Sequence, residues 1–135
     1  MVIREIGGRM IYEEYLSKND SLTFEKAMEI LEKMEANLDK NDEDARELFI
    51  DFLEGAFAYA NIRAGWLLLS NDEKMDQDKG RSLKHDSMIN RLNILARFYE
   101  NTGKDVSWRA ELGDARKRIG DFACCVAWIY GVRAR

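Results

Sequence analysis

Apolar side chains recur at steps of three and four along most of this chain, which is the spacing of one face of an α-helix. The first clear stripe begins after Thr23, a residue type that caps helix N-termini, and runs to about Asp39. A second stripe follows Asn41, whose position ahead of three acidic residues suits the positive end of a helix dipole, and runs to about Ser70. The pattern predicts two amphipathic helices, the second of which is a long central helix.

The second half of the chain repeats this pattern after an interruption. Residues 71–80 have no apolar period and many turn-forming residues, which predicts an exposed loop, although its second half could already be helical. A third helix is expected over about 81–100, ended by Gly103 in a left-handed cap. Residues 105–133 repeat with helical spacing as one helix or as two that meet at Gly113-Asp114.

The fold class that follows is all-α, a bundle of about four main helices with short loops. No alternating run of β-branched residues is long enough for a strand, and proline is absent. A length of 135 residues suits a single domain over 1–135. Within it, residues 1–20 contain the helix-breaking pair Gly7-Gly8 and at most a short helix near 10–16, so we expect a loosely attached N-terminal segment.

Charge is distributed unevenly along the chain. Residues 1–70 hold 8 basic and 15 acidic side chains, whereas residues 71–135 hold 13 basic and 10 acidic ones, within a net charge of −4. These charges are spread through helical periods and do not form a charged tail. We therefore expect the two halves to attract each other across the bundle.

Two apolar runs, 56–69 and 122–132, are long for a small protein but fall short of the roughly 20 residues that cross a bilayer. They are interpreted as central helices buried on all sides. No secretion leader is recognisable at the N-terminus, which favours the cytoplasm. Cys124 and Cys125 are neighbours on a helix and point in different directions, so both are expected to be reduced core thiols.

Two polar side chains occupy positions on the apolar stripe of the third helix. The one histidine of the chain, His85, and Arg81 continue the stripe that contains Met88 and Leu92. Such a pair facing a cavity could bind a phosphate or carboxylate, with His85 acting as a proton donor near neutral pH. The alternative is a structural histidine that bonds a helix-terminal carbonyl or an acidic neighbour.

A second polar pair interrupts the apolar runs. Arg63 lies in the most apolar part of the central helix, where a charge without a partner is costly. Asp121, in the last helix, is the natural carboxylate for Arg63, Arg81 or His85. These four residues form a candidate ligand-binding pocket, or else a buried ion-pair network that fixes the packing of the helices.

Other chemistries lack the residues they need. A di-iron site requires two Glu-x-x-His motifs, and structural zinc requires spaced cysteines, so no metal and no other cofactor is expected. A magnesium site made of carboxylates alone, as in helical nucleotide pyrophosphohydrolases, could use a row of acids on the second helix. This row falls opposite the apolar stripe and is interpreted as a solvated face: Glu43, Glu47, Asp51 and Glu54. Neither a phosphate-binding glycine loop nor a nucleophile elbow is present.

Binding to other macromolecules is the remaining class of function. The basic run 116–118 is short and the chain is acidic, so nucleic acid is not expected to bind. Trp128, Tyr130 and Val132 near the chain end suggest a surface for another protein or for a second copy, as a homodimer. The sequence therefore favours a non-enzymatic interaction module. The alternative is a bundle that binds, or even hydrolyses, a small phosphate ligand around Arg81 and His85.

Overall fold

The computed structural model describes residues 22–66 and 68–133, apart from the side chain of residue 132. Within these ranges the chain is helical with no strand, as predicted. The features expected in 1–20 lie outside the described residues. The five described helices are α2 (Phe24–Ala36), α3 (Glu43–Trp66), α4 (Asn71–Asn101), α5 (Ser107–Leu112) and α6 (Arg116–Arg133).

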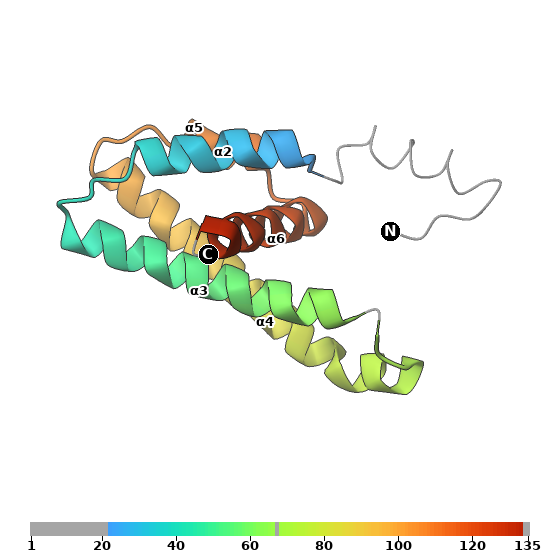
Figure 1. Ribbon diagram of the computed structural model, residues 1–135. Helices are drawn as coiled ribbons and strands as arrows, with labels where there is room; N and C mark the ends of the chain where they lie inside the picture. Colours follow the sequence, from blue (N-terminus) through green and yellow to red (C-terminus); the bar gives the residue numbers. More distant parts are fainter. Residues whose placement is uncertain (1–21, 67, 134–135) are drawn as a thin grey trace.

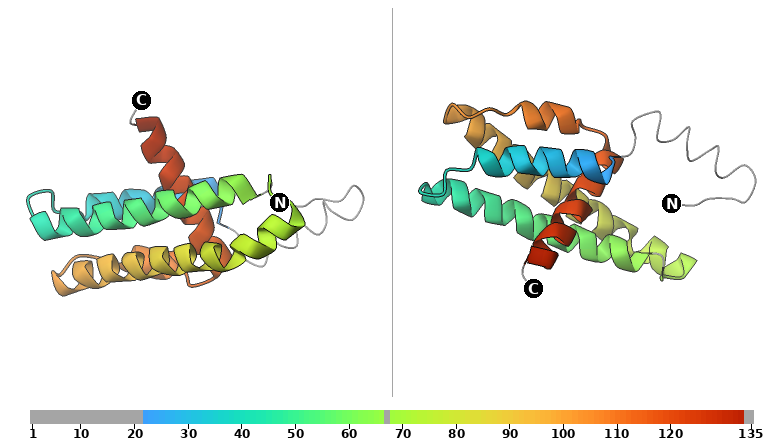
Figure 2. Two further views of the ribbon diagram at one scale, coloured as in Figure 1. Left: turned by 90° about the horizontal axis from the view of Figure 1, so that it is seen from below. Right: turned by 45° about the horizontal axis from the view of Figure 1, so that its top comes forward.

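Four of these helices stack in two layers and the fifth crosses them. The left view of Figure 2 shows α2 and α3 in one layer and α4 and α5 in the other, with α2 over α5 and α3 over α4. Helix α6 starts beside α4 and α5 and passes through the first layer. Its C-terminal end therefore emerges between α2 and α3, on the face turned to the viewer in Figure 1.

The core is one cluster of apolar side chains to which all five helices contribute. The stripe predicted for the third helix is confirmed, because its members are fully or almost fully buried: Met88, Leu92, Leu95 and Tyr99. The stripe predicted for the last segment is confirmed except at Ala115, which is exposed between α5 and α6; its buried members are Trp108, Leu112, Ile119, Phe122, Val126 and Ile129. Helical spacing located the core correctly in these elements.

The prediction of a loop over 71–80 is wrong, because these residues form the first turns of α4. Ser70 and Glu73 make a capping box: the Ser70 hydroxyl accepts from the Glu73 amide at 3.1 Å, and the Glu73 carboxylate accepts from the Ser70 amide at 2.8 Å. Two amides at the start of the helix thereby gain hydrogen-bond acceptors, which stabilises these turns without apolar packing. With 31 residues, α4 rather than the central helix is the longest described element.

The expectation of helices buried on all sides over 56–69 and 122–132 is also wrong. Helix α3 ends at Trp66, four residues earlier than predicted, and Phe57 is partly exposed on its outer side. In α6, Trp128 is 61% exposed. Because α6 emerges beyond the first layer, its tip has core on one side only.

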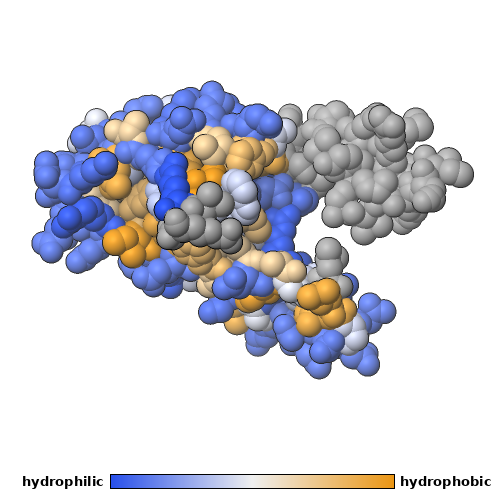
Figure 3. Space-filling view, in the orientation of Figure 1, coloured by the Kyte–Doolittle hydropathy of each residue, from blue (hydrophilic) through white to orange (hydrophobic). Residues whose placement is uncertain are grey.

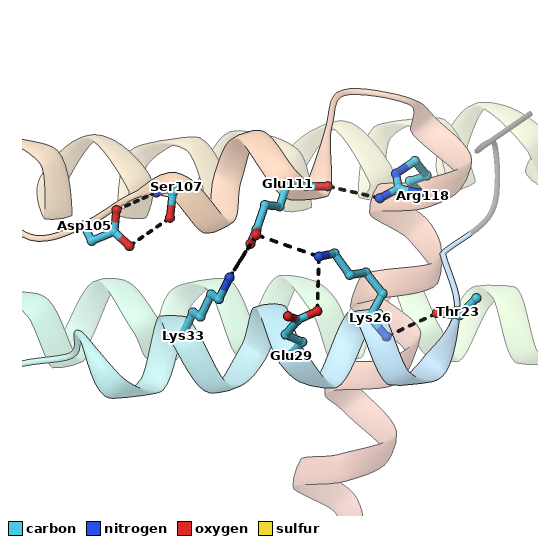
Figure 4. Close-up of polar contacts among 8 residues, drawn as sticks. All are labelled: Thr23, Lys26, Glu29, Lys33, Asp105, Ser107, Glu111 and Arg118. Carbon is cyan, nitrogen blue, oxygen red and sulfur yellow. Dashed lines mark hydrogen bonds and ion pairs between the residues drawn. The ribbon is translucent and has the colours of Figure 1, made fainter.

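The last segment, left open as one helix or two, is two helices. Gly113 adopts a positive φ of 80° between α5 and α6, a conformation that glycine takes without strain. The Arg118 guanidinium donates to the carbonyl oxygens of Leu112 and Glu111, which end α5. Glu111 in turn binds Lys33 of α2 at 2.9 Å, so the short helix is held from both sides (Figure 4). The left-handed cap predicted at Gly103 is confirmed.

The two halves of the chain are joined by ion pairs, but not in the way that their net charges suggest. Among the described residues, the pairs that link 22–66 to 68–133 are Arg63–Asp121, Lys33–Glu111, Lys26–Glu111 and Arg133–Glu35. Three of the four take the base from the acidic half and the acid from the basic half. Among these four pairs, only Arg133–Glu35 joins a base of the basic half to an acid of the acidic half, as the net charges predict.

Candidate functional site

Arg63 and Asp121 form the ion pair that the apolar surroundings of Arg63 predict. The Arg63 Nη2 atom donates to Asp121 Oδ1 at 2.6 Å, across the contact of α3 with α6. Asp121 also accepts from Lys117 Nζ at 2.9 Å and from the Leu22 amide at 3.1 Å. One carboxylate thus ties α6 to α3 and to the chain just before α2.

The packing around this pair depends on a glycine. A Cβ atom on Gly120 would lie 3.0 Å from Tyr59 Oη and 3.2 Å from Arg63 Nη1. The absent side chain lets Tyr59 and Arg63 of α3 approach the backbone of α6. Arg63 can then reach Asp121, one residue further along α6.

His85 is buried and makes one hydrogen bond, from its Nε2 atom to the Arg116 carbonyl oxygen at 2.9 Å. A carbonyl only accepts, so the proton lies on Nε2 and the neutral ring keeps a lone pair on Nδ1. The Nδ1 atom is buried with no partner among the described residues, and the Tyr59 ring packs edge-on against the imidazole. This geometry matches the structural alternative, a histidine that bonds a carbonyl at a helix end.

The electrostatic surroundings keep His85 neutral. Burial lowers the pKa of His85 below its usual value, and the positive charges of Arg116 and Arg63 act in the same direction. The hydrogen bond to the Arg116 carbonyl and the charge of Asp86 oppose this shift and do not reverse it. At neutral pH the imidazole is therefore not the proton donor that the phosphate-binding hypothesis uses.

Arg81 has partners other than Arg63 and Asp121. Its guanidinium stacks over the Trp66 ring, 4.2 Å from the ring centroid, and pairs with Asp78 at 3.1 Å. Within the described part of the chain, no hydrogen bond or ion pair joins Arg81 to the other three candidates. The structure brings Arg63 and Asp121 together, places Tyr59 against His85, and holds Arg81 at the outer end of α3.

A recess of about 170 Å³ lies elsewhere, between the α2–α3 connection and the end of α4. Several of its polar groups already serve local structure: Asp42 accepts from the amides of Asp44 and Ala45, and Thr102 donates to the carbonyls of α4. The sequence does not predict it, because its walls combine two loops with the start of α3 and the end of α4, which share no motif. Its lining residues are Asn37, Asp39, Asp42, Ala45, Phe98, Tyr99, Thr102 and Lys104.

The cysteines form no disulfide, and the described carboxylates form no metal-binding cluster. Cys124 and Cys125 are unbridged, and burial raises the pKa of both thiols, that of Cys125 to about 11. They therefore stay protonated near neutral pH. Within 22–66 and 68–133, no cluster of three or more His, Cys, Asp or Glu side chains is arranged to hold a metal ion.

The basic run at the start of α6 is occupied by internal partners. Arg116 pairs with Asp86 at 2.8 Å, Lys117 with Asp121, and Arg118 with backbone carbonyls. Each of these side chains is held by an acid or a carbonyl of the same molecule. The run therefore offers little free positive charge to a phosphate backbone.

An exposed aromatic pair lies where α6 emerges beside the start of α2. Trp128 of α6 is 61% exposed and Phe24 of α2 is 49% exposed, and the two rings meet edge to face. On the other side of α6, helix α3 exposes Ile50 and Phe57. Figure 3 shows apolar residues gathered around the end of α6, with hydrophilic residues along the outer edges of α2 and α3.

The three tryptophans have three different environments, which their sequence spacing does not distinguish. Trp108 is fully buried, Trp66 is partly covered by Arg81, and Trp128 faces solvent. All three occur in helical apolar patterns. The exposure of Trp128 depends on where α6 leaves the first layer, which is a property of the packing.

No protein-family model, curated protein or solved structure matches this sequence. Function must therefore be argued from the side chains themselves. Among the described residues, no helix combines the length and the apolar character that crossing a bilayer requires.

Proposed function

We propose that this protein is a non-enzymatic helical module that binds another protein through the exposed surface around Trp128. The observation that carries the proposal is the Phe24–Trp128 pair, in which two large aromatic side chains remain about half exposed. Tryptophan and phenylalanine are enriched in the cores of protein interfaces, where covering them from water stabilises the complex. A tightly capped, well-packed bundle supports this role by holding the pair in a fixed geometry.

The alternative, a phosphate-binding pocket around Arg81 and His85, has no comparable support. Arg63 and Asp121 neutralise each other, Arg81 is paired with Asp78, and the free nitrogen of neutral His85 is an acceptor. An anion would have to displace these partners. Two free thiols suit a reducing compartment, so the proposal includes the cytoplasm as the site of action.

Site-specific photo-crosslinking in the native host tests the proposal. A benzophenone amino acid is placed at position 128 in one variant and at position 83 in a matched control, because Leu83 is also exposed but lies on α4. We expect a discrete protein adduct from position 128 and none from position 83. An adduct of twice the chain mass would identify a second copy as the partner.

Sedimentation of the purified chain completes the test. The proposal fails if position 128 gives no adduct in the host and the chain is a monomer at all concentrations. Equal labelling from positions 128 and 83 would also contradict it, because the binding would then not be located at the Phe24–Trp128 pair.

A further inference from the structure

The two helices that flank the tip of α6 carry a large negative charge. Residues 22–66 hold 11 acidic and 5 basic side chains. Several of the acids on the outer sides of α2 and α3 are exposed and have no hydrogen bond or ion pair among the described residues. We call this set the acidic rim, and it consists of Glu25, Glu32, Glu43, Glu47 and Glu54.

The acidic rim borders the exposed apolar side chains. Glu25 follows Phe24 in the first turn of α2. On α3, Glu47 lies three residues before Ile50 and Glu54 four residues after it, so all three share one side of the helix. Carboxylates therefore lie beside the exposed apolar side chains of α2 and of α3.

Internal ion pairs leave this charge uncompensated. The bridges Arg63–Asp121, Lys33–Glu111 and Lys26–Glu111 use bases of residues 22–66 to bind acids of α6 and α5. Three of the five bases in residues 22–66 are thereby paired with acids outside the rim. The excess negative charge remains directed to solvent around the apolar side chains.

A second copy is a poor occupant of this surface. A two-fold symmetric dimer places the same patch against itself, so the acidic rim of one copy would face that of the other. Like charges brought together across an interface repel and disfavour the complex.

We propose that the Phe24–Trp128 pair and the acidic rim bind a cationic amphipathic helix of a partner protein. This inference rests on the proposed function, that the surface around Trp128 binds protein, and adds the chemistry of the partner. An amphipathic helix presents apolar anchors at i, i+3, i+4 and i+7, which cover an exposed aromatic surface. Lysine and arginine on its flanks would face the carboxylates of α2 and α3.

The exposed area of the aromatic pair is enough for a small apolar contact at the centre of an interface, with charged contacts around it. A large aromatic side chain can bury about 150–250 Å². With Trp128 61% and Phe24 49% exposed, the pair offers roughly 200–250 Å² to a partner. This is a minor part of a typical interface, so the acidic rim and α3 must supply the remaining contacts.

The probes that test the inference are three synthetic peptides of about 18 residues, or about five helical turns. The first contains lysine and alanine with leucines at i, i+3, i+4 and i+7. The second replaces every lysine by glutamate, and the third is a scrambled version of the first with no apolar stripe. Each peptide carries a fluorophore, and its anisotropy is measured against the full chain at low and at physiological salt.

We expect the lysine peptide to bind at least about tenfold more tightly than either of the others. Trp128→Ala should weaken this binding about tenfold or more, whereas Met75→Ala, at another exposed apolar position, should leave it unchanged. The combined change Glu25→Gln, Glu47→Gln and Glu54→Gln should weaken binding and reduce its salt dependence, because fewer charges are screened. Glu100→Gln, an exposed acid of α4, is the matched control.

Three results would overturn the inference. Equal binding of the scrambled peptide would indicate general ionic attraction, and equal binding of the glutamate peptide would show that charge does not select the partner. A dimer that Trp128→Ala dissociates would place a second copy on the surface. A dimer of this kind would contradict the partner chemistry but not the proposed function. The same holds if position 128 gives a crosslink to a protein while the lysine peptide binds no more tightly than the other peptides.

Discussion

Phe24 and Trp128 meet edge to face where α6 emerges beside the start of α2, with ring centroids 5.7 Å apart and ring planes at 80°. Both rings remain about half exposed, so the contact fixes their orientation without covering them. The pair therefore joins two helices and at the same time presents apolar surface to solvent. A purely structural aromatic pair would be expected to turn both faces toward the core.

This pair should contribute modestly to stability. Edge-to-face aromatic pairs add about 0.5–1.5 kcal/mol beyond area burial. In a double-mutant cycle of Phe24→Leu and Trp128→Leu, measured by urea unfolding, we expect a coupling energy of about 0.5–1 kcal/mol and a fully folded double variant. A global loss of folding in either single variant would mean that the pair belongs to the core, and the surface would then lose its functional interpretation.

Two glycines of α6 should respond in opposite directions to alanine. At Gly131 a Cβ atom would meet nothing within 4 Å, whereas at Gly120 it would lie 3.0 Å from Tyr59 Oη. We expect Gly131→Ala to stabilise the fold by about 0.5 kcal/mol through helix propensity. Gly120→Ala should destabilise it by about 1 kcal/mol, because the cost of overpacking against Tyr59 is larger than the gain in helix propensity. Thermal and urea unfolding of both variants decide this, and equal effects would refute the close approach of α3 to α6.

Removing the Asp121 carboxylate should destabilise the fold markedly. The Arg63 side chain is 30% exposed, so its charge would be partly buried without a counterion. We expect Asp121→Asn to cost roughly 2 kcal/mol, below the value for a fully buried pair because water still reaches Arg63. Lys117→Ala removes the second, exposed ion-pair partner of Asp121 and should cost less than about 0.5 kcal/mol. Similar losses for both variants in urea unfolding would contradict the central role of the Arg63–Asp121 pair.

The capping box explains why a polar segment without an apolar stripe is helical. Ser70→Ala should remove about 1 kcal/mol of local stability from the first turns of α4. Because these turns add little to the core, the change should appear in amide hydrogen exchange of residues 71–76 more than in the global unfolding midpoint. Gln77→Ala, an exposed substitution in the same segment, is the control. Unchanged exchange in Ser70→Ala would mean that another contact holds the helix start.

These features separate what the sequence predicts from what it does not. Helical spacing predicted the buried stripe of α4, because periodicity reports which side of a helix is apolar. It missed the helix over 71–80, although the Ser70-x-x-Glu73 pattern is itself a helix-start signal. It left two conflicting expectations for Trp128, burial within 122–132 and a place on a protein-binding surface, because an apolar run does not reveal where a helix leaves the core. Similarly, the carbonyl that His85 binds belongs to Arg116, and no local pattern relates these two positions.

The single histidine should make the stability of the fold depend on pH. Burial lowers the pKa of His85 in the folded state, while the unfolded chain titrates near the ordinary value of 6.5. Between these two values the unfolded chain binds more protons, so the free energy of unfolding falls as the pH decreases below about 7. Protonation would also place an N–H on Nδ1, which has no acceptor among the described residues.

A glutamine substitution isolates this effect. His85→Gln keeps an N–H donor for the Arg116 carbonyl but does not titrate, so its stability should stay level between about pH 7 and 5 while that of the unmodified chain declines. Glu73, Asp105 and Glu111 have lowered pKa values, so the stability they add is lost at lower pH in both proteins. Urea unfolding across this range gives the comparison, and proton NMR follows the one histidine directly. An imidazole that titrates at or above 6.5 in the folded chain would show that Nδ1 reaches solvent or an acid, and that His85 is not the buried neutral link between α4 and α6.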